Sequence, residues 1–325
     1  MEQRLLLVFS DLDGSLLDPI SYAWEPAAPM LRELQQENVP LILCTSKTRA
    51  EVDALRRKMG HRDPYIAENG ALLVLPWRFL GKANLRGPYT KDYVLRLGWS
   101  YGEVLRTLAE LARRAKVRVR GFHQMTAAEV SRSTGLTLAE ARKAKQREAS
   151  EPFRFVDASE AQIRTFRQMA RGYGFKVAEG ERFWHLMMGA DKGQAMALVT
   201  YLAEIVEDVR VRTIAVGDSR IDLSMLQQAD FPIVMPRSDG AVDAQLLRLL
   251  PDAVRASAAG PEAWAEAVHS AVLGHYRNAA QAVRKPHPVA AGDSWRVAAP
   301  REAVPAPSGE VRWKSPTSRK TASLR

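Results

Sequence analysis

Residues 5–15 of the chain have the sequence LLLVFSDLDGS, and this stretch decides the fold. Its first part, Leu5 to Phe9, is a short continuous apolar run, which is typical of a buried central strand in a parallel sheet. The run is followed by two carboxylates, Asp11 and Asp13, and then by a glycine and a hydroxyl. Open α/β sheets bind their ligands at the carboxyl ends of such strands. We therefore expect a functional site directly after this strand.

The carboxylates of Asp11 and Asp13 need compensation, because two negative charges do not share a small site without a cation or a proton. One expectation is a hard divalent cation held by oxygen ligands, with Mg²⁺ as the leading choice. The other is a division of labour in which one carboxylate is a nucleophile and the other a proton donor. A strand-to-helix turn capped by aspartate is the alternative that needs no catalytic role.

Apolar strands and amphipathic helices alternate in the N-terminal part of the chain. A helix is expected over 24–38, where apolar residues recur at helical spacing, and a second apolar strand over 41–44. Another helix over 49–59 and a strand over 71–75 follow. Strands that alternate with helices of about 10–15 residues favour a doubly wound parallel sheet, which is the Rossmann-like α/β arrangement.

This alternation changes near residues 81–87 and returns near Asp191. In between, two strand–helix–strand passages with short turns predict a smaller α+β domain inserted into the first. After Asp191 a helix and a strand over 210–216, which ends just before Asp218, resume the parallel sheet. The predicted organisation is a core domain over 1–84 and 188–275, an inserted cap domain over 85–187 and a basic disordered tail over 276–325.

The positive charge of the chain is concentrated at its C-terminal end. The net charge is +10, and residues 277–325 hold ten Lys and Arg against three Asp and Glu, which is +7 of the total. This end is rich in Pro, Ala and Ser without periodicity, so we expect it to be disordered. The remaining +3 is ordinary for a globular protein, so the charge does not indicate a nucleic-acid-binding fold.

The single cysteine, Cys44, excludes an intramolecular disulfide framework and a zinc site built on several cysteines. It lies in an apolar run, where a buried structural thiol is expected. No apolar run reaches the roughly 18 residues of a membrane span. The chain enters its first strand without a basic leader, so we expect a cytoplasmic protein without a signal peptide.

Four motifs follow one another at predicted strand and helix ends. They are DLDGS at 11–15, the hydroxyl of Thr45, Lys192 in an Asp-Lys-Gly sequence, and GDSxxD at 217–222. In this order the set resembles the haloacid dehalogenase-like phosphohydrolase superfamily, and the resemblance covers residues 4–275. A proton donor two residues after the nucleophile implies a phosphatase that acts on alcohol leaving groups, with a mutase as the lesser alternative.

The resemblance implies a role in phosphoryl transfer for each motif residue. Asp11 attacks phosphorus and forms an aspartyl-phosphate, while Asp13 protonates the leaving oxygen and later takes a proton from water. Thr45 binds a phosphoryl oxygen and Lys192 supplies positive charge. The implied Mg²⁺ ligands are Asp11, the main-chain carbonyl of Asp13, Asp218 and, close by or through water, Asp222.

These residue types also have interpretations without a ligand. Thr45 and Asp191 are suitable helix caps. Lysines are usually solvated, which is the alternative for Lys192. An aspartate in the first turn of a helix is favourable by itself, which is the alternative for Asp222.

The inserted domain resembles the α+β cap of the superfamily's cap-type-2 branch. Four strings resemble the mannosyl-3-phosphoglycerate phosphatase family, namely CTSKTR at 44–49, IAENGA at 66–71, QREASEPF at 146–153 and RFWHL at 182–186. Such a substrate is a sugar linked to a phosphorylated glycerate, so it offers a carboxylate to cations and hydroxyls to carboxylates and amides. The residues implied to bind it are Lys47, Glu68, Asn69, Arg147, Glu148, Ser150, Arg182 and His185. Plain core packing is the alternative for His185.

Three positions depart from the family's pattern. Ile221 stands where Asn is usual, Glu181 replaces a glycine before Arg182, and Ser15 replaces a more common Thr. The first affects the surroundings of the metal and the second affects the turn of the cap, whereas the third keeps its hydroxyl.

The expected function is hydrolysis of mannosyl-3-phosphoglycerate to the compatible solute mannosylglycerate and phosphate. The alternative within the enzyme class is another sugar phosphate, such as glucosyl-3-phosphoglycerate or sucrose phosphate. The alternative from another class is binding of nucleic acid or an acidic membrane through the tail, where Arg312-Trp313-Lys314 places an aromatic ring between cations. We expect a small-molecule substrate and neither nucleic acid nor a membrane as partner, and the oligomeric state is open.

Overall fold

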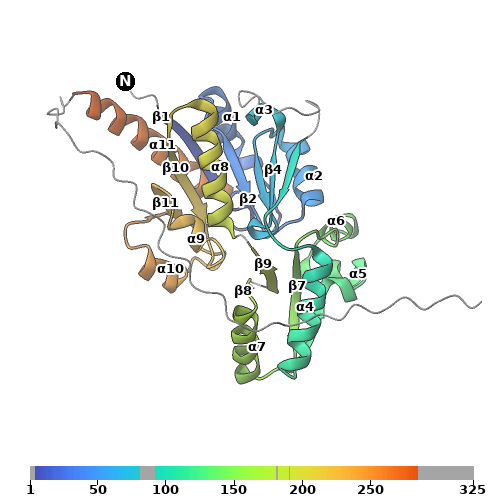
Figure 1. Cartoon of the computed structure of the whole chain (residues 1–325). Helices are drawn as coiled ribbons and strands as arrows, with labels where there is room; N and C mark the ends of the chain where they lie inside the picture. The colour runs from blue at the N-terminus through green and yellow to red at the C-terminus, as the bar shows by residue number, and fades with distance from the viewer. Residues whose placement is uncertain (1–3, 81–91, 181, 190, 285–325) are drawn as a thin grey trace, which may run out of the picture. The chain divides into compact units, whose positions relative to one another are not determined.

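The computed structural model of the chain describes residues 4–80, 92–180, 182–189 and 191–284. Two β-sheets organise these residues, one of eight strands and one of four (Figure 1). We call the part built around the eight-stranded sheet the core, and the part built around the four-stranded sheet, residues 99–188, the cap.

The core sheet consists of β1 (Arg4–Ser10), β2 (Leu41–Cys44), β3 (Tyr65–Ala67), β4 (Leu72–Leu75), β5 (Tyr93–Arg96), β10 (Arg210–Gly217), β11 (Phe231–Val234) and β12 (Val254–Arg255). Its order is β12-β11-β10-β1-β2-β3-β4-β5. The strand β1 lies inside the sheet and runs parallel to both of its neighbours, β10 and β2. Among the pairs in this sheet, β3 with β4 and β4 with β5 are antiparallel. The predicted doubly wound α/β fold is confirmed.

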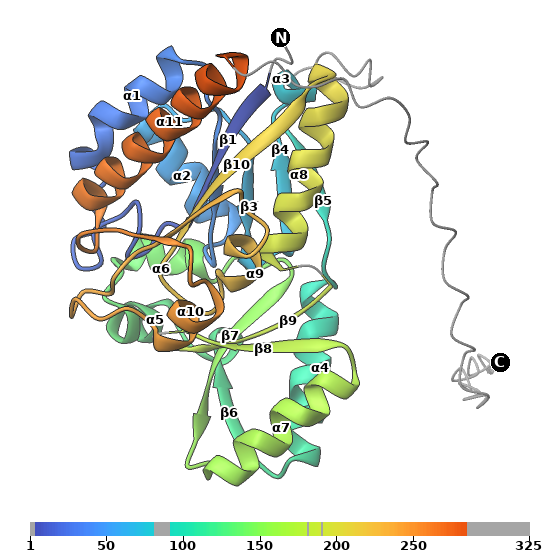
Figure 2. The same ribbon diagram turned by 90° about the vertical axis from the view of Figure 1, so that its left-hand side faces the viewer.

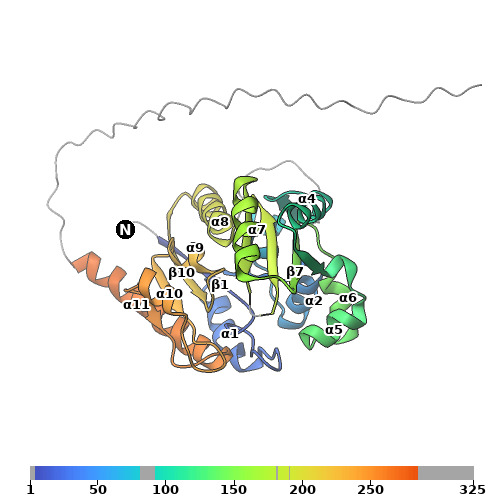
Figure 3. The same cartoon turned by 90° about the horizontal axis from the view of Figure 1, so that it is seen from below.

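Helices cover both faces of the core sheet, and Figures 2 and 3 show the two layers on opposite sides of β1 and β10. One layer contains α1 (Ala28–Gln36), α2 (Arg49–Met59) and α11 (Pro261–Arg284), with the short turn η1 (Glu25–Ala27). The other contains α8 (Lys192–Glu207), α9 (Leu223–Leu226) and α10 (Ala244–Leu249). The alternation of β1 explains this, since Leu6 and Val8 pack into the first layer and Leu7 and Phe9 into the second. Two further short elements are η2 (Glu68–Gly70) and α3 (Trp77–Leu80).

The cap sheet is antiparallel and has the order β6-β7-β9-β8. Its strands are β6 (Arg118–Gly121), β7 (Ser150–Val156), β8 (Phe175–Glu179) and β9 (Trp184–Met188). The helices α4 (Tyr101–Arg114) and α7 (Glu160–Gly172) pack against it around Phe153 and Phe166. The turn η4 (Phe122–Gln124) and the helices α5 (Ala127–Thr134) and α6 (Leu138–Ala144) form a separate apolar cluster with Phe183.

Two predicted boundaries differ from the structure. Tyr93–Arg96, which was expected within the inserted domain, forms β5 and pairs with β4 of the core, because Tyr93 packs into the apolar cluster under α8. The last helix continues to Arg284, past the expected end of the core domain at 275, because its sequence remains rich in helix-forming residues until Pro286. The rest of the expected tail, with Arg312-Trp313-Lys314, lies outside the described residues.

The last helix of the core also fixes the end of the first strand. The indole Nε1 of the buried Trp264 donates a hydrogen bond of 2.8 Å to the hydroxyl of Ser10, which donates one of 2.7 Å to the main-chain carbonyl of Asp11. A buried polar group costs stability unless it is paired, so this chain of bonds explains why a serine is tolerated inside the central strand. In the described residues, no helix combines the length and apolar composition that a bilayer crossing requires.

Candidate active site

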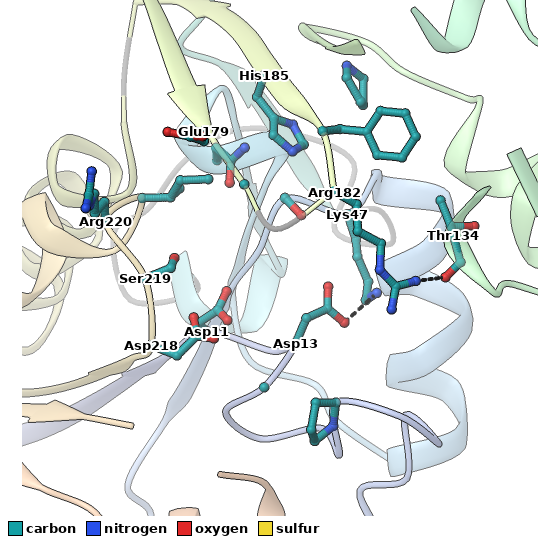
Figure 4. Close-up of a pocket in the computed structure, with 18 of the residues that line it drawn as sticks. Asp11, Asp13, Lys47, Thr134, Glu179, Arg182, His185, Asp218, Ser219 and Arg220 are labelled. Atoms are coloured by element: carbon teal, nitrogen blue, oxygen red, sulfur yellow. Dashed lines mark hydrogen bonds and ion pairs between the residues drawn. The ribbon is translucent and has the colours of Figure 1, made fainter. Parts of the chain in front are cut away.

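The predicted strand ends meet at one edge of the core sheet. Because β1 and β10 are parallel neighbours with Ser10 opposite Val216, the residues that follow them, Asp11 and Asp218, lie next to each other (Figure 4). The main-chain N–H of Asp11 donates to the carbonyl of Val216 at 2.9 Å, which continues the ladder by one bond. The structure therefore brings these two carboxylates together as the sequence predicts.

Lys192 lies between two of the carboxylates. It is the first residue of α8, whose N-cap is Asp191, and its Nζ is 2.5 Å from Asp11 Oδ1 and 2.6 Å from Asp222 Oδ1. Its side chain is 2% exposed, so the alternative of a solvated surface lysine is wrong. Burial opposes its charge, but Asp11 and Asp222 raise the pKa of Lys192 above its usual range. The ammonium group is a permanent positive charge beside Asp11.

Asp222 holds the loop that carries Asp218. One of its oxygens accepts from Lys192, and the other accepts from the N–H and the hydroxyl of Ser219, at 3.0 and 2.8 Å, and from the N–H of Asp218 at 3.3 Å. It is fully buried, and a Cβ at Gly217 would lie 2.5 Å from the Cβ of Asp222, so only glycine fits there. Both oxygens of Asp222 are engaged with protein groups, which suits a residue that orients the site.

The acidic cluster fits a metal ion. Oxygens of Asp11, Asp218 and Asp222 lie within 4.8 Å of one another. Burial, together with Asp222 and Asp13, raises the pKa of Asp11 to about 7 although Lys192 lowers it, and burial with Asp11 and Asp222 raises the pKa of Asp218 well above its usual value. Three carboxylates around one ammonium group have negative charge in excess, and an oxygen-liganded divalent cation would compensate it.

Asp13 faces a different cation. Its carboxylate is 2.7 Å from Nζ of Lys47, and Figure 4 draws this pair on the far side of Asp11 from Asp218. Its side chain is 40% exposed, so it borders the open part of the site. Lys47 was expected to contact substrate; it lines the cavity and pairs with Asp13, so that contact stays a prediction.

Gly14 closes the turn after Asp13. Its φ is +79°, and a Cβ there would approach Asp218 Oδ2 to 2.8 Å, so glycine is required on both grounds.

Thr45 is fully buried and shapes a loop. Its hydroxyl accepts from the N–H of Lys47 at 3.1 Å, and its carbonyl accepts from the N–H of Asn69 at 2.9 Å. It does not cap the next helix, since Thr48 is the N-cap of α2. Among the described residues the cavity wall here is formed by Ser46 and Lys47, so a contact of Thr45 with a phosphoryl oxygen stays a prediction.

A cavity of about 720 Å³ opens above this edge of the sheet, between core and cap. Asp11, Asp13, Lys192 and Asp218 form its floor, and β8, β9 and the 147–152 segment contribute to its walls. The predicted binding residues that line it are Lys47, Asn69, Arg147, Arg182 and His185.

Glu68, Glu148 and Ser150 were expected to bind substrate, and the described lining of the cavity does not include them. The carboxylate of Glu68 instead accepts the N–H of Glu148 at 2.7 Å and the hydroxyl of Ser150 at 2.8 Å. The side chain of Glu148 pairs with Arg49 at 2.8 Å. In this structure the three residues join the cap to the core, and their contact with substrate stays a prediction.

Two buried side chains present polar atoms to the cavity. Asn69 is 1% exposed and His185 9% exposed, and within the described chain no hydrogen bond is made by Oδ1 or Nδ2 of Asn69 or by Nδ1 of His185. Buried polar groups are normally paired, so unpaired ones that line a cavity indicate a polar ligand. Asn69 comes from the core and His185 from the cap strand β9, so such a ligand would contact both parts.

Several cavity residues had no place in the sequence-based prediction. Tyr22, Glu179, Arg220 and Arg237 line the cavity. Ile221, whose departure from the family's pattern was expected to affect the surroundings of the metal, also lines it. Arg220 lies inside the GDSxxD motif and pairs with Asp243 at 3.0 Å, so its position in the motif was a usable signal. Arg237 lies in an irregular stretch after β11 and has no motif around it. The departure at Glu181 lies outside the described residues.

The buried histidine predicts a pH dependence of stability. Burial, with the charges of Arg147 and Lys192, lowers the pKa of His185 from 6.5 to about 3. Below pH 6.5 the unfolded chain therefore binds a proton that the folded chain refuses, and the free energy of unfolding falls as the pH falls towards 3. From pH 7 to pH 5, the free energy of unfolding of His185→Gln should therefore fall by about 2 kcal/mol less than that of the unchanged protein.

Urea unfolding at the two pH values measures this difference. His269→Gln is the matched control, because the side chain of His269 is 45% exposed, and it should behave like the unchanged protein. If the free energy of unfolding falls equally in His185→Gln and in the unchanged protein, the assignment of a neutral buried ring would be contradicted.

Comparisons with known proteins agree with the fold. A family model described as haloacid dehalogenase-like hydrolase matches residues 8–92. The glucosyl-3-phosphoglycerate/mannosyl-3-phosphoglycerate phosphatase of Persephonella marina is 33% identical over 265 residues, which is 81% of this chain and 96% of that protein. The protein of the same name from Methanococcoides burtonii is 33% identical over 268 residues, 81% of this chain and 95% of that one.

Among solved structures, a haloalkanoate-superfamily phosphatase of Bacteroides thetaiotaomicron superposes with a TM-score of 0.57 and 17% identity, covering 84% of this chain and 96% of that one. At this identity the likeness concerns the fold alone. The fold and the carboxylate–lysine cluster define a haloacid dehalogenase-like hydrolase, and the chain belongs to this family. Within it the chain is a phosphoric monoester hydrolase, and the expected resemblance to mannosyl-3-phosphoglycerate phosphatases is confirmed.

Proposed function

We propose that the protein is a Mg²⁺-dependent phosphatase of glycosyl-3-phosphoglycerates, with mannosyl-3-phosphoglycerate as first substrate and glucosyl-3-phosphoglycerate as second. Both curated relatives carry the two sugars in their names. The products would be a glycosylglycerate, which as mannosylglycerate is a compatible solute, and phosphate. The observation that carries the proposal is the Asp11–Lys192–Asp218 floor beneath a cavity with unpaired polar atoms of Asn69 and His185.

In the proposed reaction an oxygen of Asp11 forms a bond to phosphorus while the bond from phosphorus to the ester oxygen breaks. Asp13 donates a proton to the departing oxygen. Water then attacks phosphorus, its proton passes to Asp13, and the bond to Asp11 breaks, which regenerates both carboxyl groups. Lys192, 2.5 Å from Asp11 Oδ1, orients the nucleophile and offsets negative charge in the transition state.

The cluster of Asp11, Asp218 and Asp222 supports the proposed cation. Asp11, the main-chain carbonyl of Asp13 and Asp218 would hold Mg²⁺, with Asp222 behind them as the residue that orients Asp218. Mg²⁺ would supply compensation for the charge on the phosphoryl group.

The cavity supports a substrate with a charged and an uncharged part. Arg147 and Arg182 line it from the cap and suit a carboxylate such as that of glycerate. The neutral ring of His185 and the amide of Asn69 suit hydroxyl groups, since both can donate and accept hydrogen bonds. A volume of about 720 Å³ is ample for a sugar joined to a three-carbon acid.

Phosphate release from a panel of esters with Mg²⁺ tests the proposal. We expect the two glycosyl-3-phosphoglycerates to exceed sucrose 6-phosphate and small generic esters in kcat/KM by at least about 100-fold, because only they engage both the arginines and the hydroxyl-binding groups. Comparable rates on every ester, or activity on the sucrose ester alone, would overturn the substrate assignment and leave the phosphatase chemistry in place.

A further inference from the structure

Glu68 is a fully buried carboxylate that the proposed reaction does not use. It directly follows β3 and opens the turn η2, in which Glu68, Asn69 and Gly70 have φ values of 50°, 59° and 103°. Consecutive non-glycine residues in the left-handed region cost energy, and such strain persists only where surrounding contacts impose it. Here the N–H of Glu68 donates to the carbonyl of Lys47 at 3.0 Å, which ties the turn to the loop between β2 and α2.

Within the described residues, the hydrogen-bond and ion-pair partners of the Glu68 carboxylate belong to one short segment of the cap. Oε1 accepts from the N–H of Glu148 at 2.7 Å, and Oε2 accepts from the N–H of Ala149 at 3.0 Å and the hydroxyl of Ser150 at 2.8 Å. The guanidinium of Arg147 lies 3.6 Å away. A carboxylate with three hydrogen bonds and a cation is satisfied, so it has no need of a substrate.

The same cap segment reaches further into the core. Nη1 of Arg147 donates to the carbonyl of Ser46 at 3.0 Å, next to the cation Lys47 that pairs with Asp13. The methyl group of Ala149 is fully buried in the main apolar cluster of the core. Residues 147–150 are therefore docked on the core by a buried charge, hydrogen bonds and apolar contact together.

The docked segment leads straight into the cavity wall. It continues into β7, where Pro152 lies opposite His185 of β9, and Arg147, Pro152 and His185 all line the cavity. A displacement of residues 147–150 would therefore move one wall of the cavity with respect to Asp11.

We infer that Glu68 is a positioning residue that latches the cap segment 147–150 onto the core and so sets the distance between the cap wall and the catalytic carboxylates. It acts through this segment and does not touch the substrate. The inference deepens the proposed function, because the wall it positions is the one assigned to the sugar and the glycerate.

Hydrogen exchange of the protein without substrate tests the latch. In Glu68→Gln one oxygen becomes an NH₂ that cannot accept, so the amides of Glu148 and Ala149 should exchange about tenfold faster or more. The N–H of Asp11, bonded to Val216 in the sheet, should keep its rate. Ser150→Ala, which leaves Glu68 intact, should give a smaller acceleration at the same two amides.

Glu148→Gln is the matched control, because it removes a partly exposed ion pair with Arg49 at the same interface and keeps the buried bonds. Its exchange rates should stay within about threefold of the unchanged protein. Unchanged exchange at Glu148 and Ala149 in a folded Glu68→Gln variant would overturn the latch, whatever the substrate is.

Kinetics separate positioning from direct contact. Glu68→Gln and Ser150→Ala should both lower kcat/KM for the preferred sugar phosphate, with a combined loss smaller than the product of the two, while turnover of p-nitrophenyl phosphate changes little. If kcat/KM falls in Glu68→Gln but not in Ser150→Ala, and the amides of Glu148 and Ala149 exchange at their normal rates, Glu68 would instead be a substrate contact. If every sugar phosphate fails as substrate, the proposed function falls, but the exchange result still decides the latch.

Discussion

Asp11→Asn is expected to lower turnover by about four orders of magnitude or more and, at the same time, to stabilise the metal-free fold. The first effect is expected because an amide oxygen is a poor nucleophile towards phosphorus. The second is expected because Asp11 is buried beside Asp218 and Asp222 with Lys192 as the nearby cation. Removal of one negative charge relieves a repulsion that Mg²⁺ would otherwise compensate.

The stabilisation has a defined pH dependence. The pKa of Asp11 is raised from 3.8 to about 7 in the folded chain, so the folded state holds a proton that the unfolded state releases. The stabilisation that comes from this proton is therefore complete below pH 3.8 and is lost as the pH rises through about 7. In Asp11→Asn this loss is missing, which should make the variant more stable at pH 8 by on the order of 2 kcal/mol.

Urea unfolding in EDTA at pH 5 and pH 8, with phosphate release in Mg²⁺, measures both effects. Asp252→Asn is the control, since it removes an exposed carboxylate and should change neither. Added Mg²⁺ should stabilise the unchanged protein more than Asp11→Asn. An Asp11→Asn protein that still turns over, or that unfolds more easily at pH 8, would contradict the role given to this residue.

Lys192→Met is expected to lose activity by about 1,000-fold and to destabilise the metal-free protein by about 3–5 kcal/mol. Methionine fills a similar volume, so the loss comes from charge. Without the ammonium group, Asp11 and Asp222 lose a partner at 2.5 and 2.6 Å, and the buried cluster retains three carboxylates. Mg²⁺ should restore part of the stability and little of the activity, because it replaces charge but not the hydrogen bond to Asp11.

Lys176→Met is the matched control for this change. Lys176 also pairs with an aspartate, Asp191, but its side chain is 47% exposed, so the substitution should cost less than about 1 kcal/mol. Equal unfolding free energies for the two variants would show that the Lys192 pairs are weak and would remove the argument for a tightly coupled cluster.

The catalytic floor could be predicted from the sequence because it depends on strand ends. A buried parallel strand followed by Asp11 and another followed by Asp218 place their carboxylates at one sheet edge, whatever the loops between them do. Lys192 at the first position of a helix behind them completes the cluster. The order of these residues along the chain was therefore enough to predict that they lie together.

The partners of Glu68, Glu148 and Ser150 could not be predicted from the order of the motifs. Their residue types suit a sugar as well as they suit each other, and a sequence string does not say which of the two they meet. The bond from Trp264 to Ser10 is also hidden, because 254 positions separate the two residues. The pairing of β5 with β4 could not be predicted either, because a long stretch of sequence that includes residues 81–91 separates the two strands.

The central claim is that Asp11 carries the phosphoryl group during turnover. Rapid quenching of Asp13→Asn with p-nitrophenyl phosphate and Mg²⁺ tests it most directly. This leaving group departs without a proton from Asp13, whereas the attack of water needs Asp13 to accept a proton. We predict a burst of p-nitrophenol close to one per protein and a protein heavier by one phosphoryl group, located on Asp11 by peptide mapping. A burst that is missing, together with an unmodified Asp11 at every quench time, would contradict the account.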